Sequence, residues 1–236
     1  MYGWKARIGL ILPSPNVVME PEFNALKPAD VSIHATRVTF TESSEGELLK
    51  MAAELDQASR LLATAGVNVI AYGCTMGSLF GGAGYDQEII KRIEQTGCRA
   101  TTTATAVLRA FKALGVSRIA VGTPYSPGAD KMEREFFQSC GLEVVNLKGL
   151  DLGIMGIRKA PPETYFELAC EVDRPEAEAV FISCTAARTL PIIAALEKRL
   201  GKYVLSSNLA TFWDVMRMLD VQAPPLRGYG KLLETI

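Results

Sequence analysis

The stretch VNVIAYGCTMG, residues 67–77, decides the fold because it is a short apolar run that ends in a small residue, a cysteine and a threonine. Runs of this kind are typical of buried parallel strands. A second stretch with the same build, AEAVFISCTAAR, occupies residues 177–188. The two stretches predict equivalent strands, one in each half of the chain, that end at Cys74 and Cys184.

The rest of the chain repeats in the same order around these strands. RIGLILPSP at residues 7–15 is matched by RIAVGTPYSP at 118–127, and TTTATAVLRAFKALG at 101–115 is matched by SSNLATFWDVMRML at 206–219. The interval from the opening arginine to the cysteine is 67 residues in the first half and 66 in the second. Three matched segments at nearly constant spacing predict an internal duplication.

Helical patterns fill the segments between the predicted strands. Helices are expected at residues 45–65, 86–95, 130–139, 162–172 and 191–200. Strands that alternate with helices predict parallel sheets with helices on both faces. The predicted fold is α/β, with two pseudo-symmetric Rossmann-like units, each a parallel sheet flanked by helices, and an active site in the cleft between them.

Two domains are expected. The first α/β unit is predicted at residues 1–104 and is completed by the C-terminal tail, residues 212–236. The second unit is predicted at residues 105–211. No linker rich in Pro, Gly or Ser separates them, so the units are expected to pack tightly.

The composition excludes several classes of function. The 236 residues hold 25 Lys and Arg against 26 Asp and Glu, with no basic run, which argues against nucleic acid and anionic membrane as partners. No apolar stretch reaches the roughly 20 residues of a membrane span. The first residues lack the features of a signal peptide, so a cytoplasmic location is expected.

The cysteine and histidine content limits the chemistry. Five scattered cysteines and a single histidine give no ligand spacing for zinc and no obvious histidine base. His34 lies in the strand-like VSIHATRV, and a structural role is predicted for it. Cys98, Cys140 and Cys170 have no symmetric partner and are predicted to be structural. Neither a metal nor an organic cofactor is expected.

Cys74 and Cys184 are the predicted catalytic pair. Ligands of open parallel sheets bind beyond the carboxyl ends of the strands, and the pseudo-symmetry brings both cysteines into one cleft. Either alone reads as a small core residue, but their symmetric placement favours function. Backbone N–H groups in such turns favour anions and a thiolate. The pair predicts acid–base or covalent chemistry on a carboxylate.

Polar residues at the strand ends are candidates for substrate binding, with ordinary turn chemistry as the alternative. Met76, together with Leu79 and Met155, forms either an apolar wall for a larger substrate or part of the core. The substrate-binding candidates are Ser14, Asn16, Thr75, Met76, Tyr125, Ser126 and Thr185.

The chain resembles the aspartate/glutamate racemase superfamily over nearly its whole length, in the branch that holds maleate cis-trans isomerase and arylmalonate decarboxylase. ILPSPNVVMEPEF at residues 11–23, YGCTMGS at 72–78 and FISCTAARTLPII at 181–193 resemble the isomerases. TTTATAVLRAFKALGVSRIAVGTPY at 101–125 and LRGYGKLLE at 226–234 are closer to the decarboxylase.

The resemblance implies a role for each cysteine. In an isomerase, Cys74 would add to a double bond as the thiolate, Cys184 would donate and accept the proton, and Asn16 and Tyr125 would bind carboxylate. In a decarboxylase, Thr75, Tyr125 and backbone groups near Cys184 would form a dioxyanion hole, and Cys184 would protonate the enediolate. Racemase-like folds are often dimers, so a homodimer or higher homo-oligomer is expected.

Two departures from the family patterns bear on the activity. Arylmalonate decarboxylases usually have glycine where this chain has Cys74, which favours isomerase or racemase chemistry. The isomerases' Asp-Asn pair is absent from LDLGIMGIRK at residues 150–159, so one carboxylate-binding asparagine is missing. The leading hypothesis is a cofactor-independent isomerase or racemase for a small carboxylic or dicarboxylic acid. The alternatives are an arylmalonate decarboxylase-like lyase and, outside enzymes, a small-molecule sensor.

Overall fold

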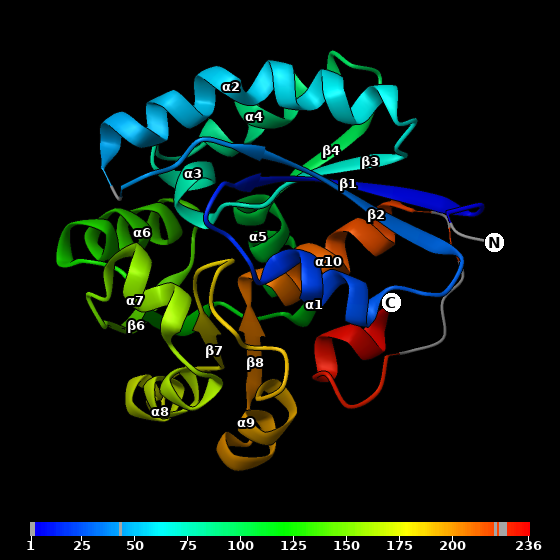
Figure 1. The fold of residues 1–236 in the computed structure, drawn as a ribbon. Coiled ribbons are helices and arrows are strands. Elements are labelled where there is room, and N and C mark those ends of the chain that lie inside the picture. The colour runs from blue at the N-terminus through cyan, green and yellow to red at the C-terminus, as the bar shows by residue number, and fades with distance from the viewer. Residues whose placement is uncertain (1–2, 43, 220, 222–225) are drawn as a thin grey trace.

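A computed structural model describes residues 3–42, 44–219, 221 and 226–236 and contains two separate sheets of four parallel strands (Figure 1). In spatial order, the strands of the first sheet are β2 (Val31–Val38), β1 (Ala6–Pro13), β3 (Val69–Tyr72) and β4 (Arg99–Thr102). Those of the second sheet are β6 (Glu143–Gly149), β5 (Arg118–Thr123), β7 (Ala179–Ile182) and β8 (Tyr203–Ser206). The matching order confirms the predicted pair of pseudo-symmetric α/β units.

Equivalent strands also pair in equivalent registers. Residues 8–11 of β1 pair with residues 69–72 of β3, and residues 119–122 of β5 pair with residues 179–182 of β7. The chain therefore leaves the central strand at the same level of each sheet. Cys74 lies two residues after the end of β3, and Cys184 lies two residues after the end of β7.

Helices cover both faces of the first sheet. The helices α2 and α4 lie over one face, α1 and α5 pack on the other, and α3 directly follows Cys74 (Figure 1). Ser44 caps α2 by accepting a hydrogen bond from the Glu47 N–H. The bounds are α1 (Met19–Leu26), α2 (Glu45–Thr64), α3 (Thr75–Leu79), α4 (Tyr85–Glu94) and α5 (Thr103–Leu114).

The second half has a sheet of the same strand order, but a different set of helices surrounds it. The bounds are α6 (Pro127–Ser139), α7 (Gly153–Lys159), α8 (Pro162–Val172), α9 (Ile193–Leu200), α10 (Ser207–Met218) and the 3₁₀ helix η1 (Lys231–Thr235). The sequence patterns missed α7. They also placed the start of α9 at Pro191, whereas turns continue up to Ile192. No helix equivalent to α3 follows Cys184 among the described residues.

One hydrophobic cluster continues through both halves. The helices α5 and α10 pack against each other between the sheets (Figure 1). The ring of Phe111 on α5 meets Phe137 and Phe181 of the second half edge-on, and burying each such ring contributes about 1.5–3 kcal/mol. Of the C-terminal segment, α10 contacts α1 and β4, while η1 contacts α10 and β8. The predicted division at residues 104 and 105 stays a prediction.

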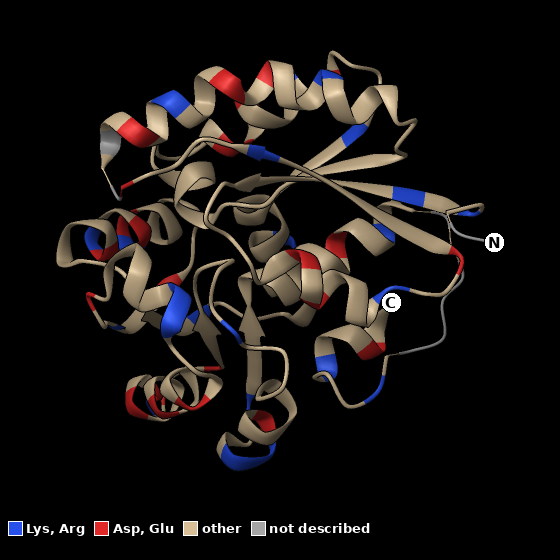
Figure 2. Ribbon diagram, viewed as in Figure 1, with Lys and Arg blue, Asp and Glu red and all other residues tan. Residues whose placement is uncertain are grey.

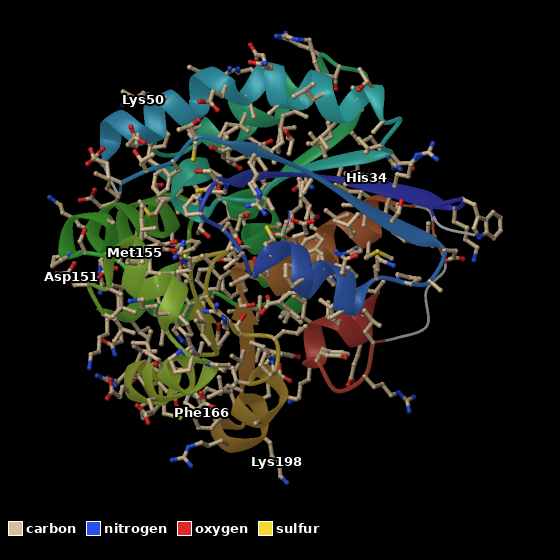
Figure 3. All side chains as sticks on the ribbon, in the orientation of Figure 1. His34, Lys50, Asp151, Met155, Phe166 and Lys198 are labelled. Atoms are coloured by element: carbon tan, nitrogen blue, oxygen red, sulfur yellow. The ribbon has the colours of Figure 1, made fainter. Side chains whose placement is uncertain are left out.

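The surface charges and the single histidine lie outside this core. Positive and negative side chains are interspersed on outer helices such as α2 and α6 (Figure 2). His34 lies on β2, where its Nε2 atom is 2.8 Å from the Ser32 hydroxyl (Figure 3). None of the described helices has both the length and the apolar character needed to cross a membrane.

Candidate active site

Cys74 and Cys184 occupy equivalent turns with different backbones. Cys74 is extended, with a φ of −143°, and caps α3 by accepting a hydrogen bond from the Gly77 N–H at 3.2 Å. Cys184 has a φ of 91°, in the left-handed region that a residue with a Cβ atom rarely adopts. Such a backbone costs about 1–3 kcal/mol. Strain of this size is typical of residues held in place for function.

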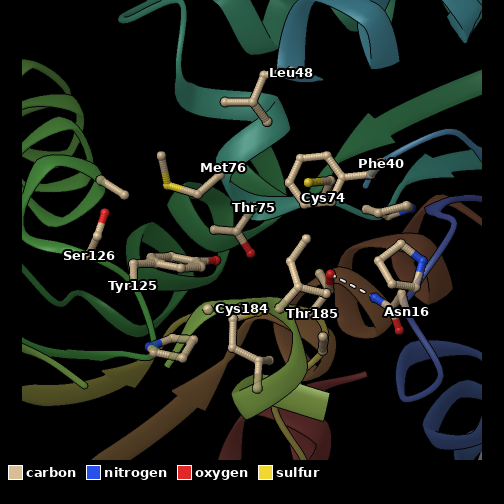
Figure 4. Close-up of a pocket in the computed structure, with 18 of the residues that line it drawn as sticks. Asn16, Phe40, Leu48, Cys74, Thr75, Met76, Tyr125, Ser126, Cys184 and Thr185 are labelled. Carbon is tan, nitrogen blue, oxygen red and sulfur yellow. Dashed lines mark hydrogen bonds between the residues drawn. The ribbon is translucent and has the colours of Figure 1, made fainter. Parts of the chain in front are cut away.

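Both thiols line a single pocket with a volume of about 520 Å³ between the two halves (Figure 4). Asp151 and Arg158 are the charged residues in the described lining. Within the part of the chain that the structure describes, no three His, Cys, Asp or Glu side chains form a group that could hold a metal ion. Most of the wall is apolar and is formed by Phe40, Leu48, Met76, Phe80, Met132, Ile154 and Ile157.

Hydrogen bonds join the two halves beside the pocket. The Asn16 amide donates to the Thr185 hydroxyl at 3.0 Å, and this hydroxyl donates to the Gly73 carbonyl at 3.0 Å (Figure 4). The side-chain Oδ1 atom of Asn16 accepts from the backbone N–H groups of Val18 and Met19 at the start of α1. One amide hydrogen of Asn16 is therefore left for a ligand. The hydroxyls of Thr75 and Ser207 lie 2.9 Å apart across the same interface.

Glu22 of α1 fixes the loop that follows Cys184. One carboxylate oxygen accepts from the backbone N–H groups of Thr189 and Leu190, both at 3.1 Å. The other accepts from the Asn208 amide at 2.7 Å. Burial raises the pKa of Glu22, and the three donors oppose that rise. A side chain of the first half thus holds the loop that follows Cys184 in the second.

Burial decides the protonation of both thiols. It raises the pKa of Cys74 to about 12 and the pKa of Cys184 to about 11. Hydrogen bonding opposes this rise at both thiols. The donor at Cys74 is the Gly77 N–H, and the donors at Cys184 include the Ala186 N–H and the Tyr125 hydroxyl. The expectation that the turns favour a thiolate is wrong, because the loss of hydration outweighs these donors.

All predicted site residues except Ser14 line the pocket. The Ser14 hydroxyl donates to the Phe40 carbonyl at 3.2 Å and accepts from the Phe40 N–H at 3.1 Å. Ser14 thus holds a wall residue in place through its backbone. Ser126 is exposed at the pocket rim, whereas Tyr125 places its hydroxyl in the interior near Thr75 (Figure 4).

The sequence reasoning missed much of the apolar wall and both charged lining residues. Of its three wall candidates, only Met76 lines the pocket; Leu79 is buried in the core, and Met155 is 52% exposed on α7 (Figure 3). The missed signal was helical spacing in residues 150–159. Ile154 and Ile157, three positions apart, place one face of α7 toward the cavity.

Known proteins share this architecture and sequence pattern. The family model described as arylmalonate decarboxylase matches residues 8–233. The maleate isomerase of Pseudomonas putida is 27% identical over 96% of each chain, and the arylmalonate decarboxylase of Bordetella bronchiseptica is 29% identical over 96% of each chain. A solved structure of Nocardia farcinica maleate cis-trans isomerase with a covalently bound succinylcysteine intermediate has a TM-score of 0.93 and 26% identity, covering 98% of this chain and 99% of that one.

These similarities extend over nearly the whole chain. They confirm the resemblance that the cysteine segments and the strand-end loops indicated. The relatives are isomerases and carboxy-lyases, so the chain is an enzyme of this kind. Its two parallel sheets and its paired strand-end cysteines are those of a duplicated α/β enzyme, and the chain belongs to the arylmalonate decarboxylase family.

Proposed function

We propose that the chain is a cofactor-independent isomerase, of the maleate cis-trans isomerase or racemase kind, that acts on a small carboxylic or dicarboxylic acid through Cys74 and Cys184. The observation that carries the proposal is the pair of buried thiols at equivalent strand ends of one pocket. Two such groups can act on a carbon from different sides, one through sulfur and one through a proton. The maleate isomerases among the relatives support this proposal.

In the proposed reaction, Cys74, which burial favours as the thiol, first loses its proton to solvent, and the resulting thiolate adds to one carbon of the substrate double bond. The electron pair moves toward the carboxylate on the other carbon, and the Cys184 thiol protonates that carbon. Rotation about the new C–C single bond converts one geometry into the other. The Cys184 thiolate then removes the proton, the C–S bond breaks, and Cys74 leaves as the thiolate. Cys184 is then a thiol again, and Cys74 regains its proton from solvent, so both cysteines return to their starting state.

Donors for substrate carboxylates lie on several sides of the pocket. Asn16 keeps one free amide hydrogen, and Thr75 and Tyr125 supply hydroxyls. Arg158 on α7 would hold a second carboxylate, in place of the asparagine that residues 150–159 lack. A cytoplasmic location and assembly into a homodimer or higher homo-oligomer belong to the same proposal.

A carboxy-lyase of the arylmalonate decarboxylase kind is the second candidate, favoured by the size and the walls of the pocket. A volume of about 520 Å³ with Phe40, Leu48 and Met132 in the wall leaves room for an apolar substituent that a four-carbon diacid does not carry. Hydroxyls of Thr75 and Tyr125 would stabilise the enediolate left by carbon dioxide. Cys184 would protonate this intermediate, and Cys74 would not be required.

The test is incubation in deuterated water with four compounds: maleate, an alkyl-substituted maleate, an arylmalonate and one enantiomer of a 2-arylpropanoate. Products are identified by proton NMR and chiral chromatography. A trans diacid indicates the isomerase, and racemisation with deuterium at the chiral carbon indicates the racemase. Release of carbon dioxide with neither of these overturns the proposal in favour of the lyase. Binding without any turnover overturns it in favour of the sensor.

A further inference from the structure

The loop that carries Cys184, residues 183–192, connects β7 to α9 through turns. In the first half, the helix α3 takes the corresponding place after Cys74. Helical hydrogen bonds satisfy backbone groups there, such as the Ser78 N–H, which donates to the Cys74 carbonyl at 3.0 Å. The loop after Cys184 has to find its partners elsewhere, because a buried N–H group without an acceptor is costly.

Glu22 of α1 connects both ends of this loop. One of its carboxylate oxygens accepts from the N–H groups of Thr189 and Leu190, both at 3.1 Å. The other oxygen accepts at 2.7 Å from the side-chain amide of Asn208, which is buried on α10. The same amide nitrogen donates to the Thr185 carbonyl at 3.0 Å. Glu22 therefore holds the end of the loop directly and its beginning through Asn208.

The Asn208 amide is held in one orientation. The Glu22 carboxylate and the Thr185 carbonyl are both acceptors, so the NH₂ group of Asn208 has to face them, with one hydrogen for each. The side-chain oxygen of Asn208 is left buried without a partner among the described residues. The two bonds from the NH₂ group thus outweigh the loss at this oxygen.

The contact of Asn208 with Thr185 bears on the catalytic thiol, because Thr185 directly follows Cys184. The backbone of Cys184 has a φ of 91°, and such a conformation persists only where the surroundings over-determine it. On one side, the Ser183 N–H donates to the Gly122 carbonyl at 2.8 Å. On the other side, Thr185 is held by its hydroxyl and by its carbonyl. Glu22 and Asn208 supply the part of this restraint that acts on the main chain after Cys184.

We propose that Glu22 is a positioning residue of the first half that, through Asn208 and Thr185, keeps Cys184 of the second half in its left-handed turn. Neither Glu22 nor Asn208 lines the pocket, so both act through the turn and not on the substrate. The inference rests on the proposed function, because it gives Glu22 a part in proton exchange at Cys184. Its main test needs no substrate.

The test compares the two thiols within one protein. The rates at which iodoacetamide alkylates Cys184 and Cys74 are measured at a fixed pH and resolved by peptide mass spectrometry. Both thiols are buried, so each rate depends on local opening around that thiol. A general loosening of the protein raises both rates, whereas loosening of the Cys184 turn alone raises the ratio of Cys184 to Cys74 alkylation.

The decisive variant is Glu22→Gln. Its amide oxygen can still accept from Thr189 and Leu190, but its NH₂ group then faces the NH₂ group of Asn208. Either the bond between the two side chains is lost, or the Asn208 amide turns over and loses its bond to Thr185. We expect the alkylation ratio to rise about tenfold, as for the loss of one hydrogen bond to a charged group.

The matched control is Glu197→Gln on α9, another buried glutamate, whose partners are the N–H groups of Val204 and Lys231. Its alkylation ratio should equal that of the wild-type protein. With a substrate that the enzyme turns over, Glu22→Gln should lower kcat with little change in KM, because Glu22 does not touch the substrate. Glu197→Gln should change neither.

Asn208→Ala is a second variant that keeps the proposal testable if Glu22→Gln does not fold. It removes the donor to Thr185 and leaves the bonds from Glu22 to Thr189 and Leu190 in place, so the alkylation ratio should again rise. The double variant should not exceed the larger single effect, because both substitutions break one link. A ratio equal to that of the wild-type protein, a joint rise of both rates or additive effects would overturn the proposal. A raised ratio in a protein that turns over none of the test substrates would instead overturn only the proposed function.

Discussion

The two halves of this duplicated chain surround their cysteines with different groups. Beside Cys74 stands Gly73, where a Cβ atom would lie 2.5 Å from the Met19 sulfur, so no polar side chain fits. The equivalent residue beside Cys184 is Ser183. The strand-end loop of the first half turns Ser14 away from the pocket, while that of the second half directs Tyr125 into it.

The helix that follows the first strand of each half, α1 or α6, also differs between the halves in how its buried glutamate is bonded. Glu22 and Glu133 each lie 15 residues after the arginine that opens their repeat, and both are buried. Glu22 takes three donors and fixes a loop, whereas Glu133 takes one and keeps an unpartnered oxygen. The comparison teaches that a symmetric pair of thiols can have divided roles. Under the proposed function, Cys74 would form the carbon–sulfur bond and Cys184 would exchange the proton.

The largest expected effect comes from removing each thiol. Cys74→Ala and Cys184→Ala should each lower kcat/KM for isomerisation by at least about 10²–10⁴-fold. With an unsaturated diacid, Cys184→Ala should accumulate a covalent adduct on Cys74, visible by mass spectrometry, because solvent can supply the proton that completes addition, whereas the base that removes it for elimination is lost. Cys98→Ala is the control without effect. An adduct on Cys184 in the Cys74→Ala variant would reverse the assignment of the two halves.

The two glutamates should respond oppositely to amide substitution. The pKa of Glu133 is raised to about 8 from 4.5, so its stabilising contribution is complete below pH 4.5 and is lost as the pH rises through 8. Between about pH 5 and about pH 9, the free energy of unfolding of the wild-type protein should therefore fall by a few kcal/mol relative to Glu133→Gln. Glu22→Gln should cost about 1–3 kcal/mol at neutral pH, because an NH₂ group then faces N–H donors. Urea unfolding followed by circular dichroism measures both, and a Glu22→Gln variant as stable as the wild-type protein at neutral pH would contradict the contrast.

Substitution of Arg158 tests whether this side chain of the pocket lining binds a substrate carboxylate. We expect Arg158→Ala to raise KM by about tenfold with little change in kcat, because a charged contact to substrate is lost outside the reacting carbons. Lys159→Ala removes the same charge from the exposed neighbouring position of α7, which does not line the pocket, and should leave KM unchanged. Equal effects of both substitutions on steady-state kinetics would show that only the general charge of α7 matters.

The smallest expected effect distinguishes the two backbones. Glycine relieves a φ of 91°, so Cys184→Gly should be more stable than Cys184→Ala by about 1 kcal/mol. At Cys74, with its extended backbone, the order should reverse, and glycine should cost about 0.5–1 kcal/mol relative to alanine. Thermal unfolding of the four variants gives both differences. The same sign at both positions would show that the Cys184 turn relaxes in the variants.

The sequence predicted the two sheets and the placement of both cysteines in one pocket, because the repeat shows the strands and the cysteines together. An apolar strand followed by Cys and Thr occurs at matched intervals, and the carboxyl ends of parallel strands must meet ligands. The pattern also predicted the bounds of α8 correctly. It missed α7, whose seven residues include Gly153 and Gly156, because glycine is unfavourable in a helix.

The two buried glutamates, Glu22 and Glu133, were less visible in the sequence. Glu133 stands among Asp130, Lys131, Arg134 and Glu135, so α6 reads as a charged, solvated helix. Its spacing from Phe136 and Phe137 places it on the buried face, and its match to Glu22 in the repeat was a further signal. The protonation of the thiols could not be predicted, because it depends on how completely the folded chain excludes water around them.

The hydrogen bonds from Asn16 to Thr185 and from Thr185 to Gly73 cross from one half to the other and back. A hinge motion that separated the sheets would break both, together with the contact of Thr75 with Ser207. Substrate entry by opening of the halves is therefore disfavoured. Substrate and product should instead pass over the rim of the pocket, with Phe40 and Ser44 on one side and the helix α7 on the other. The rate of product release in this enzyme then becomes a property of that rim, and it can be altered by substitutions there without moving either sulfur.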